Sequence, residues 1–334
     1  MSRHANISIF VPHLGCPNMC SFCNQRYIAG DTLPPSENDV KNAVETAEKS
    51  KNYNPEATEI AFFGGSFTAI EREYMESLLK AAYPYKRDGR VKGIRISTRP
   101  DAINEEILSL LKKYGVTAIE LGAQSLDNEV LRANNRGHTA ADIEKSSAMI
   151  RAAGFELGLQ MMTGLYKSDE QKDIYTAKKT ASLNPDTVRI YPTIVLEGTE
   201  LEKRYKSGEY KPQNVEEAAE LCVKLLEIFE NAGITVIRTG LHTIDESKYV
   251  AGPWHPAFKE ICDSKRFFGE IKSRLTKKGS YEISVNKRDV SRVIGQKREN
   301  IEKLKSMGFN CRVKADENIK ENQFVIKECE NKCC

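Results

Sequence analysis

The sequence predicts an α/β protein in which a partial barrel of six β-α units is followed by a small α+β module. Three observations predict this architecture. Short apolar runs alternate with segments of helical length from Ile7 to Arg238, each run ends in small or polar residues, and the alternation is lost beyond Arg238. Because strands separated by helices pair in parallel through right-handed crossovers, their polar ends should meet at one edge of the sheet.

The expected strands are apolar runs of five to seven residues: 7–11, 59–63, 93–97, 117–121, 156–162 and 187–191, with 234–238 as an added edge strand. The expected helices between them are 36–51, 71–82, 104–114, 140–153, 169–183 and 215–232. Ser36 as N-cap and Asp39 in the first turn mark the beginning of the first helix. Residues 1–241 are therefore expected to form the barrel.

A second pattern begins after a constrained loop, Gly252-Pro253-Trp254-His255-Pro256. Strands are expected at 281–285, 311–314 and 323–326, with a helical stretch over 290–305. We expect 242–280 to be a connecting segment packed on the barrel, 281–328 to be the small basic module, and 329–334 to be a disordered tail that contains cysteines. From Lys265 to Lys305 thirteen basic side chains face five acidic ones, a local net charge of +8 that can attract phosphate. A solvated helix face is the alternative explanation of such a charge run.

Composition limits the class of protein. The 334 residues are 40% hydrophobic and 29% charged, which is ordinary for a water-soluble globular protein. No apolar run approaches the roughly 18 residues that span a bilayer. Nine cysteines, an odd number, follow an N-terminus that has the pattern of a first strand and not of a signal peptide. We therefore expect a cytoplasmic protein without a membrane partner.

Three cysteines stand close together between Pro12 and Arg26, in the order Cys16, Cys20 and Cys23, with the spacing C-x3-C-x2-C. A closed structural zinc or iron–sulfur site has four protein ligands, so a compact trio indicates a metal cluster with one open position. Phe22 precedes the third cysteine. On spacing alone, half of a zinc site and thiols close by chance remain alternatives.

This motif resembles the signature of the radical S-adenosylmethionine (SAM) superfamily. The resemblance implies a radical SAM barrel in which Cys16, Cys20 and Cys23 hold a [4Fe–4S] cluster whose fourth iron binds SAM. Gly64-Gly65-Ser66 is similar to the family's glycine-rich element that contacts the SAM amino group, with Ser66 in place of the frequent glutamate. A turn that ends a strand explains a glycine pair equally well.

Two further stretches, 119–125 and 131–138, resemble the Elongator catalytic subunit and oxygen-independent coproporphyrinogen dehydrogenase. By this resemblance Gln124 and Arg136 bind SAM, Gln160 takes the place of a ribose-binding aspartate, Ser97 takes the place of a glutamate, and Met162 flanks the adenine. The implied cofactor-binding set is Phe22, Gly64, Gly65, Ser66, Ser97, Gln124, Arg136, Gln160 and Met162. For each polar member the alternative is a strand-end group satisfied by a neighbouring loop.

Residues 293–304 resemble the helix–loop–helix core of a KH RNA-binding domain, whose GxxG loop clamps the nucleic-acid backbone. The first glycine is Gly295, and Arg298 replaces the second. RNA binding and a purely structural cap remain open for this module. Cys329, Cys333 and Cys334 are either ligands of a second cluster or incidental thiols.

Residues 238–242 and 252–258 resemble the segment after the barrel in bacterial proteins similar to the Elongator catalytic subunit. The chain is thus identified as a member of that subgroup, although we expect it to lack the acetyltransferase half of Elongator chemistry. The implied enzyme reductively cleaves SAM to a 5′-deoxyadenosyl radical, which abstracts hydrogen from RNA, in particular tRNA. An electron donor such as flavodoxin or ferredoxin is expected, and DNA is not.

The residues expected on the substrate side are Arg189, Tyr191, Thr193, Arg238, His242, Trp254 and His255, and no catalytic side chain is singled out among them. Ordinary packing is the alternative for each. Two alternative functions remain: a radical SAM oxidoreductase acting on a tetrapyrrole or another small metabolite, and a non-catalytic metal-containing RNA-binding protein.

Overall fold

The computed structural model describes residues 4–12, 20–23, 33–241 and 244–329. Its contacts divide the chain into two compact units. The first unit comprises Met1–Asn214 with Leu225–Trp254, and the second comprises Val215–Lys224 with His255–Cys334. Cys16 and His242, both named from the sequence, lie outside the described residues.

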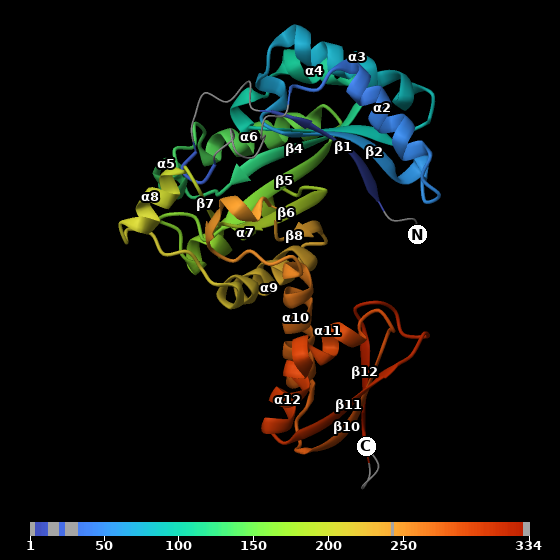
Figure 1. The fold of residues 1–334 in the computed structure, drawn as a ribbon, viewed down its shortest axis with the longest axis vertical. Coiled ribbons are helices and arrows are strands. Elements are labelled where there is room, and N and C mark those ends of the chain that lie inside the picture. The colour runs from blue at the N-terminus through green and yellow to red at the C-terminus, as the bar shows by residue number, and fades with distance from the viewer. Residues whose placement is uncertain (1–3, 13–19, 24–32, 242–243, 330–334) are drawn as a thin grey trace. The chain divides into compact units, whose positions relative to one another are not determined.

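Seven parallel strands form the sheet of the first unit, in the order β1-β2-β3-β4-β5-β6-β8. They are β1 (Ala5–Val11), β2 (Thr58–Gly64), β3 (Gly93–Thr98), β4 (Val116–Gln124), β5 (Glu156–Thr163), β6 (Thr187–Pro192) and β8 (Thr235–Thr239). The sheet curves into a half-barrel (Figure 1). This confirms the fold class predicted from the alternating pattern, because each neighbour in the sheet is also the next long strand in the sequence.

Helices connect these strands. They are α2 (Glu37–Glu48), α3 (Arg72–Arg87), α4 (Glu105–Lys113), α5 (Asn128–Ala133), α6 (Ala140–Ala152), α7 (Glu170–Ser182), α8 (Glu200–Lys206) and α9 (Val215–Asn231), the last of which is divided between the units. The predicted N-cap is confirmed: Ser36 accepts from the Asp39 amide and Asp39 accepts in return, a capping box. α3 runs five residues further than the sequence predicts, with Pro84 in its last turns. The short helices α5 and α8 were not predicted.

The two faces of the sheet differ in chemistry. Apolar side chains at alternate positions, such as Ile60, Phe62, Ile94 and Ile119, are buried under the helices in one hydrophobic core. Each such side chain contributes roughly 1.5–3 kcal/mol by leaving water. The residues between them carry polar and charged side chains and form the other face, which we call the inner face. The inner face is partly exposed toward the strand ends, for example at Ser97, Gln160 and Tyr191.

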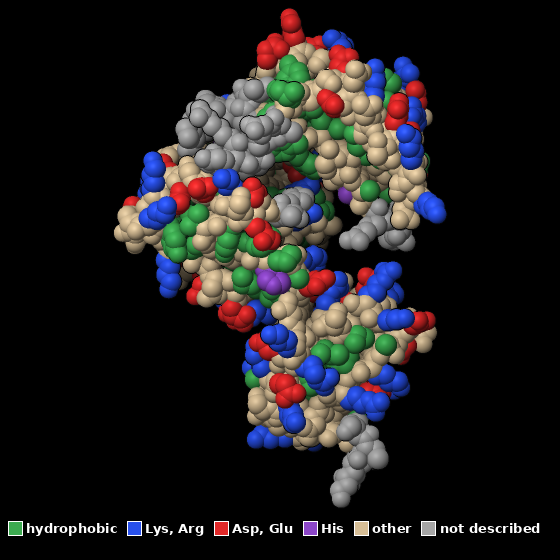
Figure 2. All heavy atoms as spheres, in the orientation of Figure 1, with side chains coloured by type: hydrophobic (Ala, Val, Ile, Leu, Met, Phe, Trp, Pro, Cys, Tyr) green, Lys and Arg blue, Asp and Glu red, His purple; other side chains and the backbone are tan. Residues whose placement is uncertain are grey.

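The second unit contains α10 (Phe258–Arg274), β10 (Gly279–Val285), α11 (Val290–Ile294), α12 (Glu299–Ser306), β11 (Phe309–Ala315) and β12 (Phe324–Glu328). Its sheet has the order β11-β10-β12, with β11 parallel and β12 antiparallel to β10. Phe267 and Ile271 of α10 share one core with Ile283 and Val285 of β10. Figure 2 shows many lysine and arginine side chains on this unit, in agreement with the basic run in the sequence.

Two smaller features complete the first unit. β7 (Val195–Leu196) pairs antiparallel with β9 (Tyr249–Ala251), and the Tyr249 and Trp254 rings lie 6.1 Å apart. Across the described ranges, the structure has no helix that is both long and apolar enough to cross a membrane.

Candidate functional site

The segment that carries two of the three motif cysteines is attached to the loop after α5. The Ser21 amide donates to the Asn134 carbonyl (3.1 Å), and the Ser21 hydroxyl donates to the Asn134 side chain (2.7 Å). The Cys23 amide donates to the Cys20 carbonyl (3.0 Å). Cys20 is 8% exposed. A tight turn therefore holds Cys20 and Cys23 in a segment that is attached to the loop after α5.

Asn134 makes most of the hydrogen bonds that attach the cysteine segment to the loop after α5. Its side chain is fully buried, accepts from Ser21, and donates to the carbonyls of Val130 (2.8 Å) and Tyr166 (2.9 Å). Sequence reasoning missed this residue. The available signal was a short polar amide inside the stretch 131–138, but nothing in the sequence indicates which of Asn134 and Asn135 is buried.

Arg136 connects the cysteine segment to the sheet. One guanidinium nitrogen donates to Cys20 Sγ (3.1 Å), and another donates to the Gly122 carbonyl (2.8 Å). Its Nε is buried and has no hydrogen-bond partner among the described residues. Hydrogen bonds to ligating sulfurs stabilise their negative charge. The arrangement therefore fits a cysteine that serves as a thiolate ligand, and leaves one donor for a further bound group.

Gln124 and Gln160 face each other across β4 and β5. Gln160 Nε2 donates to Gln124 Oε1 (2.8 Å), and a longer contact of 3.4 Å runs in the opposite direction. Gln124 has φ 65°, a left-handed backbone conformation that is unusual for a residue other than glycine. Such local strain is found at functional sites more often than elsewhere. The pair joins the two strand ends on the inner face.

Gly64 and Gly65 close β2 against β1. The Gly65 amide donates to the Val11 carbonyl (3.0 Å). Gly64 has φ +117°, and a Cβ there would lie 2.3 Å from the Val11 oxygen. Ser66 is buried and its hydroxyl is engaged with Thr98 Oγ1 (2.8 Å). Gly64 thus has a packing role, Gly65 supplies a backbone donor, and the Ser66 hydroxyl already has a partner within the protein.

The other residues implied by the resemblance take different positions. Ser97 lies on β3 with a partly exposed side chain. Met162 is buried in a small cluster with Val130 and Leu165, against which Phe22 and Tyr191 pack. Phe22 also contacts a second cluster that includes Tyr166. Phe22 therefore packs the cysteine segment against both clusters.

His138 is a buried neutral group near the end of β4. Its Nε2 lies 3.3 Å from the Ala123 carbonyl, and burial, with the nearby Arg136 charge, lowers the pKa of His138 to about 4. A neutral imidazole does not add a second positive charge beside Arg136. His138 lies within the family-like stretch 131–138, and no role was predicted for it.

Charged residues form a network on the inner face, which sequence reasoning also missed. Arg95 donates to Glu59 (2.7 Å), to Glu156 (2.7 Å) and more weakly to Glu120 (3.4 Å). Arg189 makes two bonds to Glu120, at 2.8 and 2.9 Å. The signal was available, because a single charge interrupts each of the strands β2, β3, β4 and β6.

The expected substrate-side residues do not all lie together. Arg189, Tyr191 and Arg238 lie on β6 and β8. The Thr193 hydroxyl is buried without a partner among the described residues. His255, in the second unit, accepts from the Ala257 amide through Nδ1 (3.0 Å), and Trp254 contacts Tyr249.

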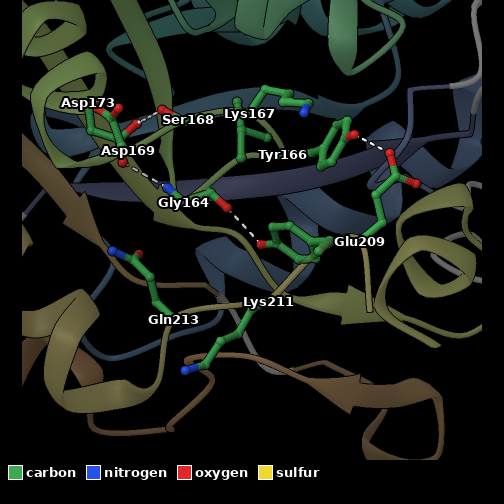
Figure 3. A pocket seen from close by; sticks show the side chains of 11 residues that line it. Gly164, Tyr166, Lys167, Ser168, Asp169, Asp173, Glu209, Lys211 and Gln213 are labelled. Carbon is green, nitrogen blue, oxygen red and sulfur yellow. Dashed lines mark hydrogen bonds between the residues drawn. The ribbon is translucent and has the colours of Figure 1, made fainter. Parts of the chain in front are cut away.

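A cavity of about 320 Å³ lies beside the loop after β5 (Figure 3). Residues of its wall form hydrogen bonds with one another. Tyr210 donates to the Gly164 carbonyl (2.7 Å), and Asp173 accepts from the Gly164 amide (2.8 Å) and from Ser168 (2.6 Å). Burial raises the pKa of Asp173 to about 7. These hydrogen bonds hold the loop after β5 in place, so we assign this part of the cavity wall a structural role.

The fold and the cysteine-bearing strand end define a class of protein. Residues 10–177 match the model of the radical SAM superfamily, and residues 185–266 match that of the radical SAM C-terminal domain. The chain therefore belongs to the radical SAM superfamily, as its motif predicts, and is an enzyme.

Within that superfamily the chain is similar to Elongator-type proteins. It is 33% identical to the tRNA uridine(34) acetyltransferase of Methanocaldococcus jannaschii, a match that covers 49% of this chain and 34% of the relative. It is 30% identical to human Elongator complex protein 3, over 54% of this chain and 37% of the relative. The matched part thus spans about one third of the length of these relatives.

The solved archaeal Elp3 of Methanocaldococcus infernus resembles the chain with a TM-score of 0.65 and 25% identity, over 82% of this chain and 64% of that structure. An uncharacterised protein of M. jannaschii is 28% identical over 81% of both chains.

Proposed function

We propose that this radical SAM enzyme modifies RNA, in particular tRNA. In this proposal Cys16, Cys20 and Cys23 hold a [4Fe–4S] cluster, and SAM binds across the carboxyl ends of β2, β4 and β5. When bound, this pair supplies reductive cleavage of SAM and a 5′-deoxyadenosyl radical that removes hydrogen from the substrate. An electron donor such as flavodoxin or ferredoxin provides the electron.

The contact between Arg136 and Cys20 is the observation that carries the cofactor part. It places a fixed positive charge on a cysteine sulfur, and Gly122 anchors the same guanidinium. The buried, unpartnered Nε of Arg136 offers a donor to the carboxylate or ribose of SAM. The Gln124–Gln160 pair offers further amide groups one strand away.

The remaining residues position the cofactors. Gly64 and Gly65 bring the backbone of β2 close to β1, which leads into the cysteine motif. Phe22 and Met162 supply apolar surface that excludes water. Ser97 presents a hydroxyl on the neighbouring strand β3. Ser66 would contact SAM through its backbone, because its hydroxyl is bonded to Thr98.

Anaerobic reconstitution with iron and sulfide tests the cofactor part. The wild-type chain should bind about four iron atoms and form 5′-deoxyadenosine from SAM when reduced. Cys16→Ala should lose most of the iron and all SAM cleavage. Cys311→Ala changes a partly buried cysteine on β11 and serves as the matched control, with both readouts retained. Stable binding of one zinc ion and no SAM cleavage by the wild type would favour the non-catalytic alternative.

The substrate part depends on the relatives and on the loop between α11 and α12. One relative named above, from M. jannaschii, is by name a tRNA uridine(34) acetyltransferase. In this chain Lys297 (φ 49°) and Arg298 (φ 66°) both have left-handed backbones, and Gly295 (φ 79°) precedes them. Asn300 fixes the loop by donating to the Val293 carbonyl (3.2 Å). Two cationic residues thus have strained backbones in the loop that resembles the RNA-clamping GxxG loop of a KH domain.

Arg298→Gly separates an RNA contact from a structural role. Glycine adopts a positive φ without strain, so the variant should be more stable than wild type by about 1 kcal/mol. If the Arg298 side chain binds phosphate, the affinity for bulk tRNA should nevertheless fall about 3-fold to 10-fold, with a smaller salt dependence. Unchanged or higher tRNA affinity in the more stable variant would contradict a phosphate contact by Arg298. Lys320→Ala, elsewhere in the same unit, is the charge-matched control.

A further inference from the structure

A row of paired residues crosses the inner face of the half-barrel. In the strand register Gly122 pairs with Gln160, Gln160 with Arg189, and Arg189 with Arg238. Directly paired residues of neighbouring parallel strands have their side chains on the same face, with the strands about 4.8 Å apart. The register shifts just before the Arg189–Arg238 pair, but Arg238 interacts electrostatically with Arg189 and Tyr191 and therefore lies near them. Arg238 is thus two strands, or about 10 Å, from Gln160 of the proposed SAM site.

Arg189 is neutralised within the protein. Two of its nitrogens bond to Glu120, and its guanidinium lies over the Phe63 ring, 5.1 Å from the centroid. It is 8% exposed. Its third nitrogen donates to the Tyr191 hydroxyl at 3.4 Å. Arg189 therefore acts as a fixed support that orients Tyr191.

Arg238 differs from the other inner-face arginines because it has no carboxylate partner. It is half-buried, and no described residue accepts a hydrogen bond from it or forms an ion pair with it. Burial and the like charge of Arg189 lower the pKa of Arg238, while Tyr191 has the opposite effect. A desolvated guanidinium beside a second cation is electrostatically unfavourable unless an anion binds.

Tyr191 completes the donor set. Its hydroxyl accepts from Arg189, and its own proton has no acceptor among the residues that the structure describes. The Tyr191 side chain is partly exposed, as is that of Arg238. The carboxyl ends of β6 and β8 thus present one hydroxyl donor and one guanidinium group without a described partner. Together these groups can donate hydrogen bonds to an oxyanion.

We propose that Arg238 and Tyr191 form a phosphate subsite that holds a backbone phosphate of the substrate RNA beside the SAM site, an inference that rests on the proposed function. Arg95 and Arg189 are unsuited to binding a phosphate, because their guanidinium groups already form ion pairs with glutamates. The subsite fixes the position of the target nucleotide relative to SAM, so Arg238 is a substrate-binding residue and Arg189 a positioning residue.

The test measures the KM for bulk tRNA isolated from a strain that lacks this protein, with 5′-deoxyadenosine formation by the reconstituted enzyme as readout. Arg238→Met should raise this KM about 10-fold to 100-fold, as expected for loss of a charge-assisted pair. Arg238→Lys keeps the charge without the two-pronged geometry, so an intermediate KM is expected. Tyr191→Phe should raise the KM a few-fold. Ile237→Met, at the neighbouring exposed position of β8, should leave KM and iron content unchanged.

Two competitors identify the group that is recognised. Uridine 5′-monophosphate should inhibit the wild type more strongly than uridine, and this preference should disappear in Arg238→Met. Equal inhibition by both compounds, or an unchanged KM in Arg238→Met and Arg238→Lys with normal iron content, overturns the subsite while the proposed function stands. If bulk tRNA does not stimulate the wild type, the proposed function fails and the subsite fails with it.

Discussion

Single charged residues interrupt otherwise apolar strands in this half-barrel: Glu59 in β2, Arg95 in β3 and Glu120 in β4. Arg95 bonds to both glutamates, and Arg189 supplies the second positive charge by pairing with Glu120. Removing one member of such a buried network leaves an unpaired charge and typically costs about 3–5 kcal/mol. The network therefore holds the inner face in one arrangement. Arg238 differs from the arginines of the network because no described carboxylate pairs with it.

Asn134 should be essential for the attachment of the cysteine segment. Asn134→Ala removes three buried hydrogen bonds and should lower the free energy of unfolding by about 3 kcal/mol. Because the Ser21 bond is among them, iron content after reconstitution should fall as well. Asn135→Gly is the matched control: it removes one exposed bond to Glu200 and tolerates the φ of 55°, so its stability should change by less than about 0.5 kcal/mol. Equal iron content in Asn134→Ala and wild type would contradict this role.

Asp173 should make stability depend on pH. Its folded-state pKa of about 7 lies above the ordinary value of 3.8, so the folded protein binds more protons than the unfolded chain between these values. Stability contributed by this group is present below about pH 4 and is lost as the pH rises through 7, with a slope of up to about 1.4 kcal/mol per pH unit.

Asp173→Asn cannot ionise and should lack this slope. Urea unfolding at several pH values should show the variant gaining stability relative to wild type as the pH rises from 4 to 7. Ser168→Ala removes a hydrogen bond that lowers the Asp173 pKa and should shift the wild-type slope to higher pH. A difference between Asp173→Asn and wild type that is independent of pH would show that the carboxyl titrates normally.

Strand ends, rather than strand centres, determine where the site forms. β1 ends at Val11, whose carbonyl receives the Gly65 amide, and the end of β4 carries the strained Gln124. The sequence pattern predicted which strands exist, because their apolar side chains alternate in a simple way. It did not predict α5 and α8, which are too short for a helical period to be recognised.

Gly64→Ala tests the junction of β1 and β2. A methyl group there would lie 2.3 Å from the Val11 oxygen, at a φ of +117°. Stability should fall by about 3 kcal/mol, and iron content should fall with it, because β1 leads into the cysteine motif. Gly154→Ala is the control: its φ is also positive (+83°), but nothing lies within 4 Å of the added carbon, so only about 1 kcal/mol should be lost. A similar loss in both variants would mean that the contact with Val11 is unimportant.

For the whole molecule, the sequence predicted the fold class and the superfamily correctly, because parallel β-α repeats and a C-x3-C-x2-C motif are both periodic or local signals. The contacts that hold the site together are not local. Ser21 and Asn134, Cys20 and Arg136, and Glu120 and Arg189 are each separated by more than sixty residues. Such pairs depend on strand register and loop conformation, which a single sequence does not specify.

The central claim, that this radical SAM enzyme modifies tRNA, is tested most directly by mass spectrometry of tRNA nucleosides from a strain that lacks the protein. We expect at least one modified nucleoside to disappear, to return when the wild-type chain is supplied, and to remain absent with Cys20→Ala. Cys311→Ala should restore it. An identical set of modified nucleosides in all of these strains would contradict the claim.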